Sequence, residues 1–239
     1  MVDGARESRG ARHEGFALTG RDRELLGWIG RHGVVTAEQV ACRFFAGPGG
    51  AIGRKVAYRR LAKLEGHGLL ARRATSLWGA RRVLLVTHAG ARAAHLHLAP
   101  ARVVEPELQH SLALVDLMDG LAEEHPGSTC RTERELRTDR SRERGSGARR
   151  AGRGRTPDGE LTLESGQTVA IELDLTPKRS VAYEQIIRSY RQERFDRVWW
   201  YVPPGSVERL RRLVEDARTD DFIEVRAWVP ERRISADRW

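Results

Sequence analysis

The chain has 239 residues, of which 42 are Lys or Arg and 33 are Asp or Glu, and its net charge is +9. With 40% hydrophobic residues, this composition excludes a fully disordered chain and suits one large or two small domains. The longest apolar runs fall well below the ~20 residues that cross a bilayer, and the first residues do not resemble a secretory signal. We therefore expect a soluble, cytoplasmic protein.

The positive charge is concentrated in two segments. Residues 1–95 hold 17 basic and 7 acidic side chains, and residues 137–155 hold 8 and 2. An excess confined in this way is expected where a protein faces a polyanion, so DNA is the first partner to consider. A GC-rich coding bias is the alternative, because 39 of the 42 cations are Arg, but such a bias would not by itself confine the excess to two segments.

The first third of the chain has the element order of a winged helix. Thr19 and Thr36 are N-cap residues for helices ending near His32 and Phe45, and an apolar stripe predicts a third helix over 52–65. Two short strands, 69–73 and 81–87, follow around a basic tip. We predict a disordered N-terminus over 1–17 and a winged helix domain over 18–98, in which the third helix would enter the major groove.

Basic residues occur where that geometry needs them. The third helix would supply base and phosphate contacts and the strands would touch the backbone. Packing by Tyr58, solvated arginines or a protein-docking role are the alternatives. The predicted DNA-binding residues are Arg54, Lys55, Tyr58, Arg59, Lys63, Arg72, Arg73, Arg81 and Arg82.

The remainder of the chain reads as an α/β domain over 104–230, followed by a tail over 231–239. Segments in which apolar residues recur at helical spacing alternate with segments in which they recur at every second position, as in strands. This order predicts a mixed central sheet. Residues 138–155 are rich in Arg, Ser and Gly, and we interpret them as a flexible loop. The expected helices cover 106–124, 181–190 and 207–214, and the expected strands cover 129–137, 160–164, 169–175, 198–202 and 222–229.

Acidic residues gather on one predicted strand of this domain. Glu172 and Asp174 are two positions apart, so they project from the same face ~6 to 7 Å apart. Asp158 follows Pro157 in a turn, Lys178 comes just after the strand, and Glu135 is a weaker fourth carboxylate. Such a set suits phosphodiester hydrolysis with Mg²⁺ or Mn²⁺, in which Asp158, Glu172 and Asp174 bind the metal and Lys178 orients water. Surface carboxylates paired with the many arginines are the alternative.

Short motifs add a resemblance. Pro157-Asp158, Glu172-Leu173-Asp174 and Lys178 resemble a degenerate PD-(D/E)XK nuclease core, of the restriction-endonuclease-like fold. The motifs LTGRD (18–22), AYRRLAKL (57–64), HSLALVD (110–116) and TERELR (132–137) together resemble the replication-relaxation family. That family occurs in actinobacteria and other Gram-positive bacteria, often with plasmids and other mobile elements.

The resemblance implies a DNA-binding protein in the replication, transfer or control of a mobile element, with other replication or transfer proteins as further partners. The sequence departs from the nuclease pattern, because Asp174 stands where the catalytic lysine is expected. Some nucleases of the superfamily carry an acidic residue there, and others take the lysine from a neighbouring element, so Lys178 could substitute. Two hypotheses follow. In the first, the nuclease-like domain has no catalytic activity and is retained for binding or assembly. In the second, it is an active metal-dependent DNA endonuclease or nickase.

Overall fold

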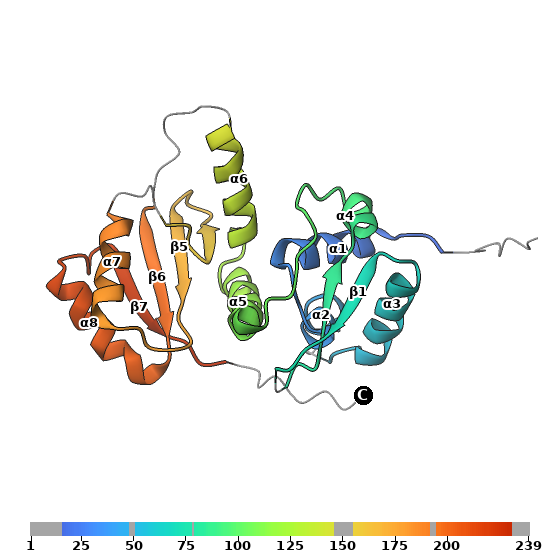
Figure 1. Ribbon diagram of the computed structural model, residues 1–239, viewed down its shortest axis with the longest axis horizontal. Helices are drawn as coiled ribbons and strands as arrows, with labels where there is room; N and C mark the ends of the chain where they lie inside the picture. The colour runs from blue at the N-terminus through green and yellow to red at the C-terminus, as the bar shows by residue number, and fades with distance from the viewer. Residues whose placement is uncertain (1–15, 48–50, 78, 146–154, 192–194, 231–239) are drawn as a thin grey trace, which may run out of the picture.

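The structure is a computed structural model that describes residues 16–47, 51–77, 79–145, 155–191 and 195–230. Most of the predicted disordered N-terminus, part of the predicted loop and the whole predicted tail lie outside these residues. Two groups of elements are joined by a long helix near the middle of the molecule (Figure 1).

The first group contains three helices, an antiparallel hairpin and a short fourth helix. Thr19 and Thr36 each accept a hydrogen bond from the backbone of the third helical residue, and the side chains of Asp22 and Gln39 bond back to the capping residues. These capping boxes explain why two helices begin where the sequence predicts. The elements are α1 (Gly20–His32), α2 (Ala37–Phe45), α3 (Arg54–Gly66), β1 (Leu70–Ala74), β2 (Arg82–Val86) and α4 (His88–Ala93).

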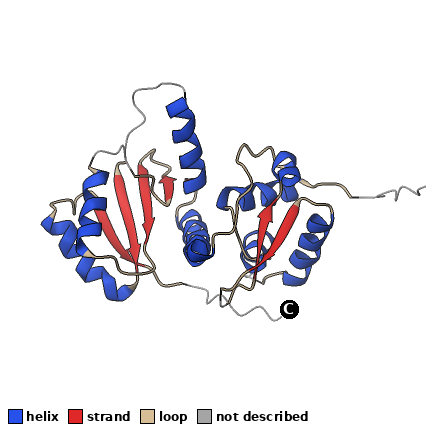
Figure 2. Cartoon of the chain, in the orientation of Figure 1, coloured by secondary structure: helices blue, strands red, loops and turns tan. Residues whose placement is uncertain are grey.

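The second group is built on a five-stranded mixed sheet in the order β3-β4-β5-β6-β7 (Figure 2). Strand β4 pairs antiparallel with both β3 and β5, whereas β6 pairs parallel with both β5 and β7. This confirms the predicted α/β class with a mixed central sheet. The elements are α5 (Glu105–Glu124), β3 (Thr129–Thr132), α6 (Glu133–Gly145), β4 (Gly159–Thr162), β5 (Thr168–Leu173), α7 (Ser180–Tyr190), β6 (Arg197–Val202), α8 (Val207–Asp216) and β7 (Ile223–Ala227).

Helix α5 is buried on several sides and belongs to the cores of both groups. Val115 packs with the core of the first group, Leu112 packs beneath the hairpin, and Met118 packs on the sheet. Helices α7 and α8 cover the opposite face of the sheet through a second cluster that includes Trp200. A helix shared in this way fixes the position of the sheet relative to the winged helix, because displacing it would expose apolar surface in both cores.

One prediction is wrong. The expected strand over 129–137 ends at Thr132, and residues 133–145, which include the first part of the expected flexible loop, form helix α6. The segment has a single large apolar residue, Leu136, but Glu and Arg have good helix propensity, and Glu133 pairs with Arg137 at the favourable spacing of four residues. The rest of the expected loop, residues 146–154, lies outside the described part of the chain.

Within the described residues, none of the helices combines the length and the apolar character that spanning a membrane requires.

Candidate functional site

A stripe of cations runs along the exposed side of α3. Lys55, Arg59 and Lys63 are four residues apart and all three are exposed. They lie nearly opposite the buried side of the helix, which is formed by Ala57, Leu61 and Leu64. Among the described residues, no acidic side chain forms an ion pair with any of the three cations. The stripe therefore presents its full charge to solvent.

Two other predicted DNA-binding residues of α3 hold the domain together. Arg54 donates from Nε to both carboxylate oxygens of Glu38 in α2 at 2.9 Å, and the Tyr58 hydroxyl donates to the same carboxylate at 3.1 Å. Their side chains are therefore drawn to α2. For Tyr58 this is the packing role that was the alternative to DNA binding, whereas the contact between Arg54 and Glu38 was not predicted from the sequence.

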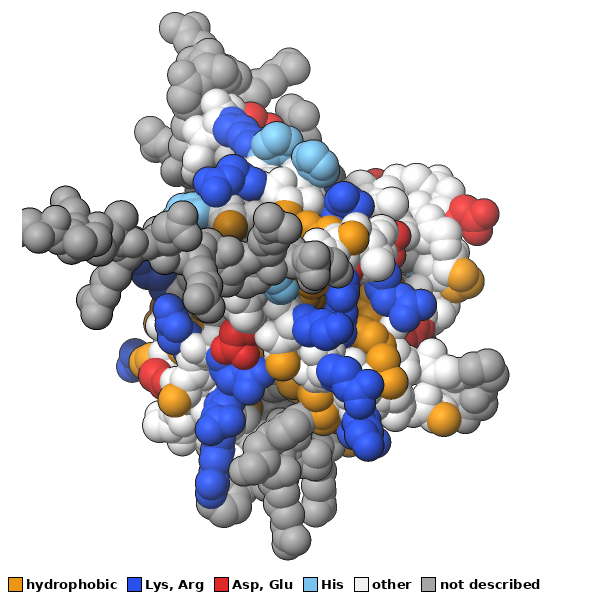
Figure 3. Space-filling model, turned by 90° about the vertical axis from the view of Figure 1, so that its right-hand side faces the viewer, with side chains coloured by type: hydrophobic (Ala, Val, Ile, Leu, Met, Phe, Trp, Pro, Cys, Tyr) orange, Lys and Arg blue, Asp and Glu red, His pale blue; other side chains and the backbone are white. Residues whose placement is uncertain are grey.

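The hairpin places more cations beside α3. Arg72 pairs with Glu65 at 3.1 Å, whereas Arg73, Arg81 and Arg82 are exposed near the end of the hairpin. Strand β1 lies against α3 (Figure 1), and the view onto this end of the molecule shows Lys and Arg side chains spread over it (Figure 3). We define the basic surface as Lys55, Arg59, Lys63, Arg73, Arg81 and Arg82.

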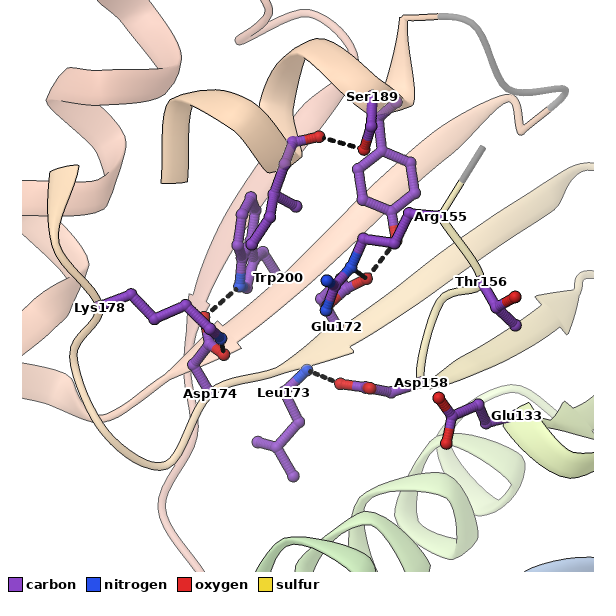
Figure 4. A network of polar contacts seen from close by, with 12 residues as sticks. Glu133, Arg155, Thr156, Asp158, Glu172, Leu173, Asp174, Lys178, Ser189 and Trp200 are labelled. Atoms are coloured by element: carbon purple, nitrogen blue, oxygen red, sulfur yellow. Dashed lines mark hydrogen bonds and ion pairs between the residues drawn. The ribbon is translucent and has the colours of Figure 1, made fainter. Parts of the chain in front are cut away.

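The acidic strand lies in the second group of elements. Glu172 is fully buried on β5, and its face of the sheet is covered by α7. Arg155 donates to both of its oxygens, from Nε at 3.0 Å and from Nη2 at 3.1 Å, and the Tyr190 hydroxyl donates to Oε1 (Figure 4). Burial raises the pKa of Glu172 and the charge of Asp158 raises it further, while the donors Arg155 and Tyr190 act in the opposite direction.

Asp174 follows β5 and has its own partners. Its carboxylate forms an ion pair with Lys178 and accepts a hydrogen bond from Trp200 Nε1 at 3.0 Å (Figure 4). The predicted pairing of Glu172 and Asp174 on one face is therefore observed, since both contact residues on the side of the sheet covered by α7. Lys178 is near them, as predicted, and burial lowers its pKa.

Asp158 approaches the same strand from β4. Its Oδ2 accepts a hydrogen bond from the Leu173 backbone N–H at 2.9 Å and lies 3.3 Å from His110 Nε2. His110, on α5, also contacts the Leu173 carbonyl at 2.9 Å. The contact with Asp158 raises the pKa of His110. Asp158 thus joins α5 to the sheet.

Glu135 does not join these carboxylates. Its Oε2 accepts hydrogen bonds from the Thr132 backbone N–H at 2.8 Å and from the Thr132 hydroxyl at 2.9 Å, so it caps the start of α6. Glu133, by contrast, lies beside Asp158 (Figure 4), and burial raises its pKa. The sequence reasoning missed Glu133, Arg155, Tyr190 and Trp200, and only the buried position of Glu172 could have indicated that a donor was required.

The three predicted ligands do not fit a divalent metal. Mg²⁺ needs about six oxygens at roughly 2.0 to 2.1 Å in octahedral geometry. Glu172, Asp158 and Asp174 each direct oxygen atoms to a different protein donor, and two of those donors are cations. No group of three or more His, Cys, Asp or Glu side chains among the described residues is arranged to hold a metal.

The 110–116 and 132–137 motifs lie where the two groups of elements meet. Gln39 of α2 donates to the Leu112 carbonyl at 2.8 Å and to Asp116 at 2.9 Å. The Thr132 hydroxyl donates to the Arg31 carbonyl at 3.0 Å, and Arg134 donates to the Gly30 and Ala99 carbonyls. Both motifs therefore connect the winged helix to the sheet.

The family model described as Replication-relaxation matches residues 26–201. The chain belongs to this family. Membership supports a role in replication or mobile-element biology. The match begins within α1 and extends through the connecting helix α5 to β6, so it includes the basic surface and the acidic residues Asp158, Glu172 and Asp174. Among curated proteins, none matches the sequence.

His32, at this junction, should make the fold sensitive to acid. Burial and the charges of Arg31, Arg43 and Arg134 lower its pKa to about 3. The folded state therefore binds fewer protons than the unfolded state between pH 6.5 and 3, so stability is complete above pH 6.5 and is lost as the pH falls. Because the ring keeps part of its surface exposed, we expect a loss of about 1 to 2 kcal/mol at pH 4.

Urea unfolding at pH 7 and pH 4 would measure this loss. His32→Gln should show a smaller difference between the two pH values than the wild type, and the same change at exposed His88 serves as the control. An equal pH dependence in wild type and His32→Gln would contradict the prediction.

Proposed function

We propose that the chain is a DNA-binding component of the replication, transfer or control of a plasmid or other mobile element. Its winged helix binds duplex DNA through the basic surface, and its nuclease-like domain is a non-catalytic part that supports assembly with other replication or transfer proteins. The observation that carries the proposal is the stripe of Lys55, Arg59 and Lys63, exposed and without acidic partners among the described residues.

The geometry of α3 supports this function. Residues four apart on a helix are separated by ~6 Å along its axis, so the stripe extends over ~12 Å on one side of the helix. The major groove, about 12 Å wide, admits a helix, and Lys and Arg side chains at its edges reach phosphates. Arg73, Arg81 and Arg82 on the neighbouring hairpin provide further cations for the DNA backbone.

The polar partners of Glu172 and Asp174 support the proposal that the nuclease-like domain is not catalytic. A carboxylate that is already neutralised by Arg or Lys is a poor ligand for a metal ion and a poor base for water. Glu172 and Asp174 are both in this state, through Arg155 and Lys178 respectively. An active metal-dependent nuclease is the second hypothesis.

Salt-dependent DNA binding tests the proposal. Fluorescence anisotropy with a labelled 25-base-pair duplex would compare the wild type with the Arg59→Ala/Lys63→Ala double variant. Two lost phosphate contacts should reduce the slope of log K against log salt by about 2 and weaken binding about 30-fold at 0.15 M salt. Arg188→Ala/Arg212→Ala, which removes two exposed charges from α7 and α8, is the matched control and should bind with only a small loss.

Unchanged affinity in a folded Arg59→Ala/Lys63→Ala variant would remove DNA recognition from α3 and favour protein docking by this domain. Incubation of the same proteins with supercoiled plasmid, with and without Mg²⁺ or Mn²⁺, addresses the second hypothesis. We expect the plasmid to remain supercoiled. Nicking that requires metal and disappears in Glu172→Gln would establish the enzyme instead.

A further inference from the structure

We infer that Arg155 is the permanent internal counter-ion of the buried Glu172 carboxylate and stands in the place that a metal ion would otherwise take. This inference does not depend on DNA binding by α3. It concerns a residue that lies at the end of the segment predicted to be a flexible loop and that the sequence reasoning did not include in the site.

The contact is bidentate and lies at the centre of the acidic group. The planar guanidinium covers both oxygens of Glu172 at 3.0 and 3.1 Å, which is the geometry that makes arginine specific for carboxylates. Tyr190 donates to the same carboxylate. The negative charge of Asp158 also acts on the guanidinium (Figure 4). Of the three carboxylates that were predicted to bind metal, Arg155 thus contacts Glu172 directly and interacts electrostatically with Asp158.

The burial of Glu172 makes such a partner necessary. An isolated carboxylate with no exposed surface would lose its hydration without compensation, which is among the most destabilising changes in a protein interior. Lys178 does not supply the missing charge directly, since its ion pair is with Asp174. Asp158 adds a second negative charge and His110 is directed to Asp158. Removing the guanidinium should therefore leave Glu172 as an unpaired charge.

Thermal unfolding of a double-mutant cycle would test the assignment at pH 8, where protons compete less for the carboxylate. Arg155→Ala should lower the melting temperature by about 10 °C. Adding Glu172→Gln should restore more than half of the loss, because the amide keeps a hydrogen-bond acceptor for Tyr190 and removes the charge. Arg131→Ala is the matched control, because its side chain is 37% exposed against 36% for Arg155 and its partners are less buried than Glu172.

Manganese is the second readout. Millimolar MnCl₂ should raise the melting temperature of Arg155→Ala by several degrees, since a divalent ion can occupy the vacated position between Glu172 and Asp158. It should leave the wild type, Arg131→Ala and the Arg155→Ala/Glu172→Gln double variant unchanged. Equal stabilisation of the wild type, or no response of Arg155→Ala, would overturn the inference.

If Arg155→Ala is recovered only as aggregate, the Arg155→Ala/Glu172→Gln double variant tests whether Arg155 is the counter-ion of Glu172. Recovery of soluble, folded Arg155→Ala/Glu172→Gln would support the assignment, because the damage would then come from the unpaired carboxylate. Failure of both proteins to fold would overturn it, since Arg155 would then be needed for reasons independent of Glu172. DNA binding by the folded variants should equal that of the wild type, so a failure here is distinguishable from a failure of the proposed function.

Discussion

Replacing Asp22 by Ala is expected to lower the free energy of unfolding of the winged helix by about 3 to 5 kcal/mol. Asp22 is buried and has two roles. It completes the capping box with Thr19, and it forms an ion pair with Arg60 of α3, whose Nε donates to Oδ1 at 2.7 Å. Burial tends to raise the pKa of Asp22, but the hydrogen bonds from Arg60 and Thr19 outweigh this and lower the pKa. The carboxylate is therefore charged at neutral pH, and its removal leaves a partly buried guanidinium unpaired.

Chemical unfolding followed by tryptophan fluorescence would measure the loss, because Trp28 lies in the core of this domain. Glu24→Ala, an exposed acidic residue of the same helix, should change the stability by about 0.5 kcal/mol or less. A loss of similar size in both variants would show that the Asp22 pair contributes little beyond general charge.

Replacing Arg134 by Ala should destabilise the junction between the two groups of elements by about 2 to 4 kcal/mol, because two hydrogen bonds from a charged donor are lost. The Gly30 carbonyl at the end of α1 and the Ala99 carbonyl in the connecting segment would both lose a partner. The expected fall in melting temperature is about 5 to 12 °C for a chain of this size. Arg134 makes these contacts from α6, so its loss should also loosen that helix.

Differential scanning calorimetry with hydrogen exchange would test both parts of this expectation. Amides of α6 and of the last turn of α1 should lose protection before those of β5 and β6. Arg137→Ala removes a more exposed arginine from the same helix and should have little effect, since Arg137 makes only a surface pair with Glu133. Unchanged protection of α6 in Arg134→Ala would mean that the helix is held by Leu136 and its backbone alone.

Much of the fold could be predicted because its determinants are local. Thr19 and Thr36 each form a capping box with a residue three positions later, so four consecutive residues are enough to determine where each helix begins. Helix α6 could not be predicted in this way. It has almost no apolar periodicity, and it is fixed by Leu136, which is buried, and by Arg134, whose partners Gly30 and Ala99 lie 104 and 35 residues away in the chain.

The candidate site was predictable in part because some of its determinants are also local in the sequence. Alternation along β5 placed Glu172 and Asp174 on one face, which needs only the period of a strand. Their partners depend on tertiary structure: Arg155 comes from a segment of low complexity, Tyr190 from α7 and Trp200 from β6. Glu135 was misplaced because the change from strand to helix at residue 133 turns its side chain back toward Thr132.

The position of α3 at the outer edge of the molecule has a steric consequence. In Figure 1, α3 lies at one end of the long axis and the helices that cover Glu172 lie at the other, with α5 between them. If the proposed contact with DNA is made at α3, a straight duplex would leave the surface of α7 and α8 uncovered. Under that proposal, we expect this surface to remain accessible to a second macromolecule while the protein is on DNA.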